Sequence, residues 1–190
     1  MTYNSVELLE SLDAEIQRIL QNVTQLKQLD NKVLNTQPAP GKWSVAQVLE
    51  HLNSYNRYYL PQIEKATGVA SATAAPATTF KPGWLGDYFT KSMYSSVVTK
   101  GEITNKMKAP KDHQPAETLD SLKVIAEFEQ GAKKLSELLR GAKARNISKV
   151  RVPISIAKWI KISLGDTFRF LIAHKTRHFL QLRNTLAAVQ

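Results

Sequence analysis

The sequence predicts an all-α protein whose four long helical segments suit a four-helix bundle. Hydrophobic residues recur at three- and four-residue steps along several long stretches, which is the spacing of amphipathic helices. Strand signals are weak, and Pro- or Gly-containing connections of unequal length separate the helical stretches. The chain has 190 residues, of which 43% are hydrophobic and 22% charged. This is an ordinary globular composition, and we expect a single domain over residues 1–190.

The first two long helices are predicted in the N-terminal third of the chain. An apolar stripe runs through residues 3–29 and predicts the first. Residues 31–40 read as a connector because prolines there cannot propagate a helix. Ser44, with Gln47 three residues later, matches a capping box. A second helix is therefore expected over residues 45–66.

The middle of the chain carries weaker signals. Residues 66–82 are rich in Ala, Thr and Ser, and we expect a loop or lid there. Residues 84–94 favour a short helix, whereas residues 97–111 show no clear period. A proline followed by acidic residues then predicts a third long helix over residues 116–139.

The C-terminal part of the chain contains the last predicted helix. Residues 150–162 suggest an extended stretch followed by a helical turn. Asp166 is a plausible N-cap for a helix that continues to about residue 187.

Charge is distributed unevenly along the chain. The net charge is +10; residues 131–190 hold 13 Lys plus Arg against two acidic residues, whereas residues 1–130 hold 13 basic and 14 acidic residues. The basic surplus could attract nucleic acid, an anionic membrane surface or a negatively charged small substrate, or it could be a solvated face. No helix-turn-helix pattern accompanies it, so we do not expect a nucleic-acid partner.

The sequence also limits where in the cell the protein is expected and which kinds of site it can contain. There is no cysteine, which excludes disulfides, thiolate metal sites and a cysteine nucleophile. The first twenty residues lack the pattern of a secretory signal. The most apolar run, residues 160–173, is interrupted by charged side chains and is too short to span a membrane. We therefore expect a cytoplasmic protein without a membrane partner.

Three histidines fall on predicted helices in a pattern typical of a metal site. His174 and His178 are four residues apart and share one helix face with apolar neighbours. His51 lies on an apolar face of the second helix. Three imidazoles that point into the core need polar partners. One divalent cation such as zinc can bind a nitrogen lone pair from each of the three rings. Hydrogen-bonded core histidines and a chance spacing are the alternatives. His113, in a polar segment, is expected to be exposed.

Other side chains receive more modest predictions. Tyr55, one turn after His51, could reach the site and bind substrate, although packing is the simpler role. Lys175 and Arg177 lie between the two histidines and are expected on the solvent side. The three tryptophans are expected to pack in the core or at the bundle ends. No carboxylate stands at helical spacing beside His174 or His178, so no general base is assigned.

Two short motifs resemble a known family. The run WSVAQVLEHL at residues 43–52 resembles the start of the second helix in the DinB/YfiT-like superfamily of metalloenzymes. The run HKTRH at residues 174–178, with Gln181 following, resembles the H-x-x-x-H segment on the last helix of that superfamily. The motifs occur in the expected order and together span most of the chain.

The resemblance implies a four-helix bundle in which His51, His174 and His178 hold one nickel, zinc or similar divalent ion, often in a homodimer. Related members are thiol-dependent transferases and isomerases that use a low-molecular-weight thiol, or metal-dependent hydrolases. The Ala/Thr-rich stretch of residues 66–82 carries no motif that can be transferred, so substrate contacts there stay unassigned.

Two functional hypotheses follow. The first is a metal-dependent S-transferase or hydrolase that acts on a small molecule. The alternative is a non-catalytic metal-binding protein or dimeric scaffold, which predicts a closed ion site without a pocket leading to it.

Overall fold

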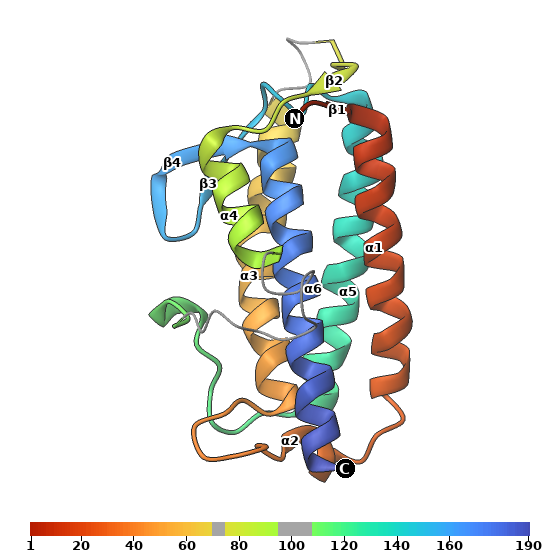
Figure 1. Cartoon of the computed structure of the whole chain (residues 1–190), viewed down its shortest axis with the longest axis vertical. Coiled ribbons are helices and arrows are strands. Elements are labelled where there is room, and N and C mark those ends of the chain that lie inside the picture. The colour runs from red at the N-terminus through yellow and green to blue at the C-terminus, as the bar shows by residue number, and fades with distance from the viewer. Residues whose placement is uncertain (70–74, 95–107) are drawn as a thin grey trace.

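Four long helices lie side by side and form the body of the molecule (Figure 1). The structure is a computed structural model that describes residues 1–69, 75–94 and 108–190. The helices are α1 (Ser5–Leu26), α3 (Val45–Val69), α5 (Ser121–Gly141) and α6 (Leu164–Val189). α1 and α3 each contact both α5 and α6, which closes a four-helix bundle around one apolar core. The predicted all-α four-helix bundle is confirmed.

Figure 1 also shows the helix directions. α1 and α6 run one way, α3 and α5 run the other way, and the two termini lie at opposite ends. Shorter elements precede or connect these helices: β1 (Tyr3–Asn4), α2 (Asn31–Asn35), β2 (Thr79–Phe80), α4 (Trp84–Tyr94), η2 (Lys111–His113), η3 (Ala142–Ala144), β3 (Arg151–Ile154) and β4 (Ala157–Ser163).

Capping side chains set where the first two long helices begin. Asn4 Oδ1 accepts the backbone N–H groups of Val6 (2.9 Å) and Glu7 (3.2 Å), so α1 starts two residues later than predicted. The predicted capping box is present at the start of α3. Gln47 N–H donates to Ser44 Oγ (3.2 Å), and Ser44 N–H donates to Gln47 Oε1 (3.0 Å).

The starts of the last two helices differ from the prediction. α5 begins at Ser121 rather than at residue 116, because Asp120 caps it by accepting the Lys123 N–H at 3.2 Å. α6 begins at Leu164 because Ser163 is its N-cap. The Ser163 hydroxyl accepts the Asp166 N–H (3.0 Å) and donates to the Asp166 carboxylate (2.7 Å). Asp166 is therefore a partner of the cap and not the cap itself.

A β-hairpin replaces the predicted extended stretch and helical turn. β3 pairs antiparallel with β4, and Val152 and Ile162 form a cross-strand pair whose side chains are buried. Trp159 of β4 is 83% exposed. Trp84 is 82% exposed, so the expected packing of the tryptophans is wrong for these two; Trp43 is partly buried against the core.

The segments predicted as irregular are described only in part. α3 continues to Val69, and Thr79–Phe80 pairs with Tyr3–Asn4, so both ends of the predicted loop or lid are ordered. Residues 70–74, and residues 97–107 of the stretch without a period, lie outside the described residues. The predicted connector at residues 31–40 contains the one-turn helix α2.

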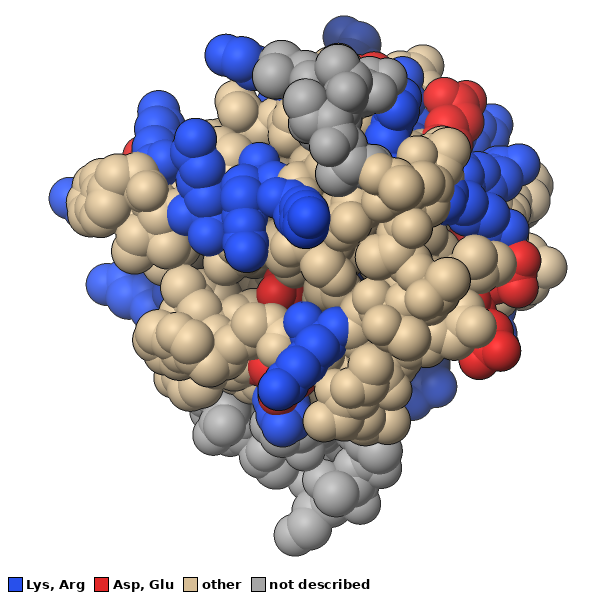
Figure 2. Space-filling model, turned by 90° about the horizontal axis from the view of Figure 1, so that it is seen from above, with Lys and Arg blue, Asp and Glu red and all other residues tan. Residues whose placement is uncertain are grey.

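Basic side chains outnumber acidic ones on the end of the bundle seen from above (Figure 2). Their largest group lies on the side from which the β3–β4 hairpin projects in Figure 1. Residues 138–165, which include the hairpin, contain seven Lys plus Arg and no acidic residue. Among the described residues, no helix has the length and apolar character needed to cross a membrane.

α4 is fixed against the N-terminal part of α6 by close backbone approach and charge. A Cβ added at Gly86 would lie 2.3 Å from Asp166 Cβ, so only glycine allows this contact. The Arg169 guanidinium reaches the carboxylates of Asp87 (2.9 Å) and Asp166 (3.5 Å). The Gly83 N–H donates to Asp166 at 3.0 Å. These contacts place α4 beside α6.

We predict that Gly86→Ala lowers the free energy of unfolding by about 1–3 kcal/mol, because the added methyl group forces α4 away from Asp166. Urea unfolding followed by circular dichroism measures the change. Gly68→Ala is the control: no atom lies within 4 Å of its added Cβ, and alanine should stabilise the helix by about 0.5–1 kcal/mol. Equal stability of wild type and Gly86→Ala would contradict the close contact.

Candidate metal centre

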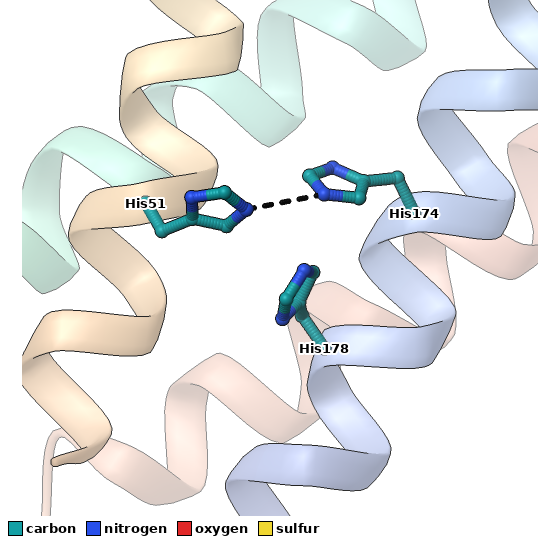
Figure 3. A group of neighbouring side chains, drawn as sticks. All are labelled: His51, His174 and His178. Atoms are coloured by element: carbon teal, nitrogen blue, oxygen red, sulfur yellow. Dashed lines mark hydrogen bonds between the residues drawn. The ribbon is translucent and has the colours of Figure 1, made fainter. Parts of the chain in front are cut away.

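His51 of α3 and His174 and His178 of α6 converge inside the bundle (Figure 3). One ring nitrogen from each lies within 4.8 Å of the others. His51 Nε2 is 3.2 Å from His174 Nε2. The His178 ring centroid is 4.7 Å from that of His51 and 4.5 Å from that of His174. The predicted histidines are therefore brought together.

The helices dictate this convergence. The spacing of four residues puts His174 and His178 one above the other on α6. His51 follows the capping box of α3 by one to two turns and lies among the fully buried Val48 and Leu52. α3 and α6 are neighbours, so both apolar faces point to the same interior.

The spacing of the rings suits one divalent cation. Two imidazole nitrogens that bind one tetrahedral zinc ion at about 2.0–2.1 Å lie about 3.3 Å apart. The 3.2 Å between the Nε2 atoms of His51 and His174 matches this value. His174 Nδ1 is buried and has no hydrogen-bond partner in the described structure. The residues present therefore fit a metal ion.

Hydrogen bonds at the outer nitrogens orient two of the rings. The His51 Nδ1–H donates to the backbone carbonyl of His113 at 2.6 Å, and the His178 Nδ1–H donates to Gln181 Oε1 at 2.8 Å. Both partners are acceptors only, so each ring carries its proton on Nδ1. The Nε2 lone pairs are then free to face the centre, as in metal sites with an outer shell of acceptors.

His113 is buried, and its expected exposure is wrong. Only 5% of the residue is exposed. The Ser54 hydroxyl donates to the His51 carbonyl (2.7 Å) and accepts from His113 Nδ1 (2.9 Å). Together with the bond from His51 Nδ1 to the His113 carbonyl, these contacts close a ring of three hydrogen bonds. No sequence pattern indicated His113 or Ser54, because they are brought to His51 by the fold.

The comparisons with known proteins agree with this geometry. A family model described as the DinB superfamily matches residues 12–182. This chain belongs to the DinB superfamily. Among solved structures, it is similar to YfiT from Bacillus subtilis, described as a probable metal-dependent hydrolase with an unusual four-helix bundle topology. The TM-score is 0.50 and the identity 16%, over 95% of this chain and 83% of that one.

At 16% identity, the likeness to YfiT shows a common fold and does not by itself transfer an activity. No curated protein matches the sequence. The site of this DinB-superfamily chain must therefore be interpreted from its own residues.

Burial keeps the converging imidazoles neutral. Loss of solvation lowers the pKa of His51 to about 4 and that of His178 to about 3. The same cause, together with the neighbouring rings, holds the pKa of His174 well below its usual value. Neutral imidazole is the form that binds a metal ion, so the rings are ready for a cation at neutral pH.

Tyr55 lies against the histidine cluster, as the sequence suggested. Its ring stacks on His113 with a centroid distance of 3.9 Å and lies 4.3 Å from the ring of His174. Burial raises the pKa of the Tyr55 phenol, so the hydroxyl keeps its proton and can only be a neutral donor or acceptor.

Lys175 and Arg177 do not face solvent, contrary to expectation. The Lys175 side chain is fully buried, and its Nζ donates to Asn56 Oδ1 at 2.8 Å. Burial lowers the pKa of Lys175 to about 7. Arg177 is 5% exposed. Their burial follows from the position of α6, which is packed by α1, α3 and α4 on different sides.

We predict that the free energy of unfolding of the metal-free protein falls between pH 7 and pH 5. His51 and His178 stay neutral in the folded chain over this range, whereas in the unfolded chain they titrate near 6.5. The unfolded state binds more protons, so acid favours it, by about 1–2 kcal/mol for each ring.

Urea unfolding of chelator-treated protein at several pH values tests this. In His51→Gln, one titrating ring is removed and the pH dependence should be weaker than in wild type. Stability that is constant or rises on acidification would show that the rings are protonated in the folded chain.

Proposed function

We propose that this protein is a metal-dependent hydrolase of a small molecule and that His51, His174 and His178 hold its metal ion. The observation that carries the proposal is the convergence of three neutral imidazoles with two Nδ1 protons already engaged elsewhere. The description of YfiT as a probable metal-dependent hydrolase supports the same reaction class for this chain.

The donor set limits the choice of metal. Three imidazoles suit zinc or nickel, and the chain has no thiolate to offer. No carboxylate joins the three rings among the described residues, which leaves a coordination position for water or substrate. A cation in such a site would make a water or thiol ligand more acidic and so more nucleophilic near neutral pH.

The surrounding residues have separate tasks in this proposal. The His113 carbonyl and Gln181 hold two of the rings in the metal-binding orientation. Tyr55 would donate a hydrogen bond from its neutral hydroxyl to the substrate. Trp43 lies on another side of the cluster, with its ring centroid 5.0 Å from that of His51, and would help to exclude water.

Transfer to a low-molecular-weight thiol is the second candidate reaction. The sequence resemblance to thiol-dependent transferases of the superfamily favours it. Without a cysteine of its own, the chain would need such a thiol as a cosubstrate. A homodimer in the cytoplasm is part of the same proposal. The non-catalytic scaffold remains the alternative if the ion proves to be coordinatively closed.

We predict that wild-type protein purified without an affinity tag contains about one equivalent of zinc or nickel per chain. His178→Ala should lose most of it, because one of three ligands is removed. Elemental analysis gives the content directly. Lys161→Met, on the exposed outer strand β4, is the control and should keep its metal. Equal trace amounts in wild type and His178→Ala would exclude the proposed site.

We predict that Tyr55→Phe keeps the metal but lowers kcat/KM by about three- to tenfold, the effect of one neutral hydrogen bond. The substrate is taken from a panel of esters and amides assayed without thiol, and of electrophiles assayed with cysteine as the thiol. Activity without thiol identifies the hydrolase, and strict thiol dependence identifies the transferase. An unchanged kcat/KM in Tyr55→Phe would leave Tyr55 a packing residue only.

A further inference from the structure

A cavity of about 320 Å³ that has charged and polar residues in its lining lies between α3, η2 and the β3–β4 hairpin. Its volume falls in the usual range of small-molecule sites. None of the three converging histidines lines it, so it is separate from the candidate metal centre. The side chains that decide what it can bind are Ser54, Arg57, Asp112, His113, Ser155 and Lys158.

The strongest cation of the lining is already neutralised. Arg57 donates two hydrogen bonds to the Glu50 carboxylate (2.9 and 3.0 Å) and two to the Glu127 carboxylate (2.6 and 2.9 Å). These bonds raise the pKa of Arg57. Four of the five N–H donors of Arg57 are therefore engaged, and its charge is balanced by two carboxylates, so Arg57 holds α3 and α5 together.

One cation and one carboxylate of the lining are free. Lys158 of β4 and Asp112 of η2 make no ion pair with each other or with any other described residue. The two belong to different elements that border the same cavity. Unpaired charges of opposite sign on two elements that border one cavity are complementary to a ligand that carries both signs.

A neutral hydrogen-bond acceptor lies beside Asp112 on the η2 side of the cavity. His113 carries its proton on Nδ1, because the Ser54 hydroxyl spends its own proton on the His51 carbonyl and can only accept from that nitrogen. His113 Nε2 is then an acceptor, and it adjoins Asp112 on η2. The Ser155 hydroxyl hydrogen-bonds with the Tyr59 side chain, so Lys158 is the donor that the hairpin offers to a ligand.

We propose that this cavity binds a small zwitterion of the amino-acid or dipeptide type. The ammonium group lies at the η2 side, where Asp112 and His113 Nε2 accept its N–H groups. The carboxylate lies at the hairpin side, where Lys158 donates. That this ligand is the substrate of the metal centre rests on the proposed function, whereas the binding itself does not.

The cavity is joined to the histidine cluster through one residue. His113 borders the cavity with its side chain and holds the His51 ring with its carbonyl. A ligand that hydrogen-bonds to His113 Nε2 is therefore connected to the candidate metal ligand His51 through a single residue, His113. This connection places a zwitterion recognised here next to the chemistry proposed for the cluster.

The test is a titration of full-length, chelator-treated protein with L-alanyl-L-alanine, followed by ¹H–¹⁵N chemical shifts. Saturable shifts confined to η2, the adjoining part of α3 and the hairpin are expected, with affinity in the millimolar range. N-acetyl-L-alanyl-L-alanine and L-alanyl-L-alanine amide, which each lack one charge, should bind about two- to fivefold more weakly. Because no metal is present, the outcome is independent of the proposed function.

Two variants test which residue binds which charged group of the ligand. Lys158→Met should weaken binding of L-alanyl-L-alanine about two- to fivefold, so that it binds no more tightly than its amide. Asp112→Asn should weaken binding by a similar factor, so that L-alanyl-L-alanine binds no more tightly than the N-acetyl peptide. Lys161→Met, an exposed lysine of the same strand outside the cavity, is the matched control and should bind as wild type. Absence of saturable shifts, equal binding of all three peptides, or equal effects of Lys158→Met and Lys161→Met would each overturn the proposal.

Discussion

The need to satisfy three converging imidazoles, two of them buried and one partly buried, governs the interior of this bundle. A neutral imidazole carries one donor and one acceptor, and leaving either unpaired in an apolar core is costly. The donors of His51 and His178 are satisfied by the His113 carbonyl and by Gln181. Their acceptors meet the His174 ring at one point, where His51 Nε2 lies 3.2 Å from His174 Nε2, a spacing that suits two nitrogens on one cation. A divalent cation completes this arrangement with a single group.

The fold delivers this arrangement through helix starts. The capping box at Ser44 and the Ser163 cap fix the first residues of α3 and α6, and therefore the rotation and height at which each helix presents its histidines. α4 then holds the start of α6 through Gly86 and the paired charges of Asp166 and Arg169. Contacts far from the cluster thus determine how well the three rings meet.

Local signals in the sequence were sufficient to predict the long helices and the three histidines that converge. The capping box and the four-residue spacing of His174 and His178 act within one or two helix turns, so a sequence pattern contains them. The hairpin was missed because β4 is mostly accessible to solvent and shows no alternation of buried and exposed residues; only Ile162 and Ser163 of this strand are buried, and Trp159 is exposed. His113 was missed because its burial depends on long-range packing against Tyr55 and Ser54, which no local pattern encodes.

The misassignment of Lys175 shows what is distinctive about α6. From Leu164 to Lys175 every residue is buried, because α1, α3 and α4 all pack on this helix. This stretch of α6 has no solvent face, so its charged groups lie inside, where each needs a partner such as Asn56 for Lys175. Such a helix cannot rotate without breaking several buried contacts at once. Two of the three converging histidines are therefore carried by a well-constrained element, which suits a site that must keep three nitrogens within a few ångströms of each other.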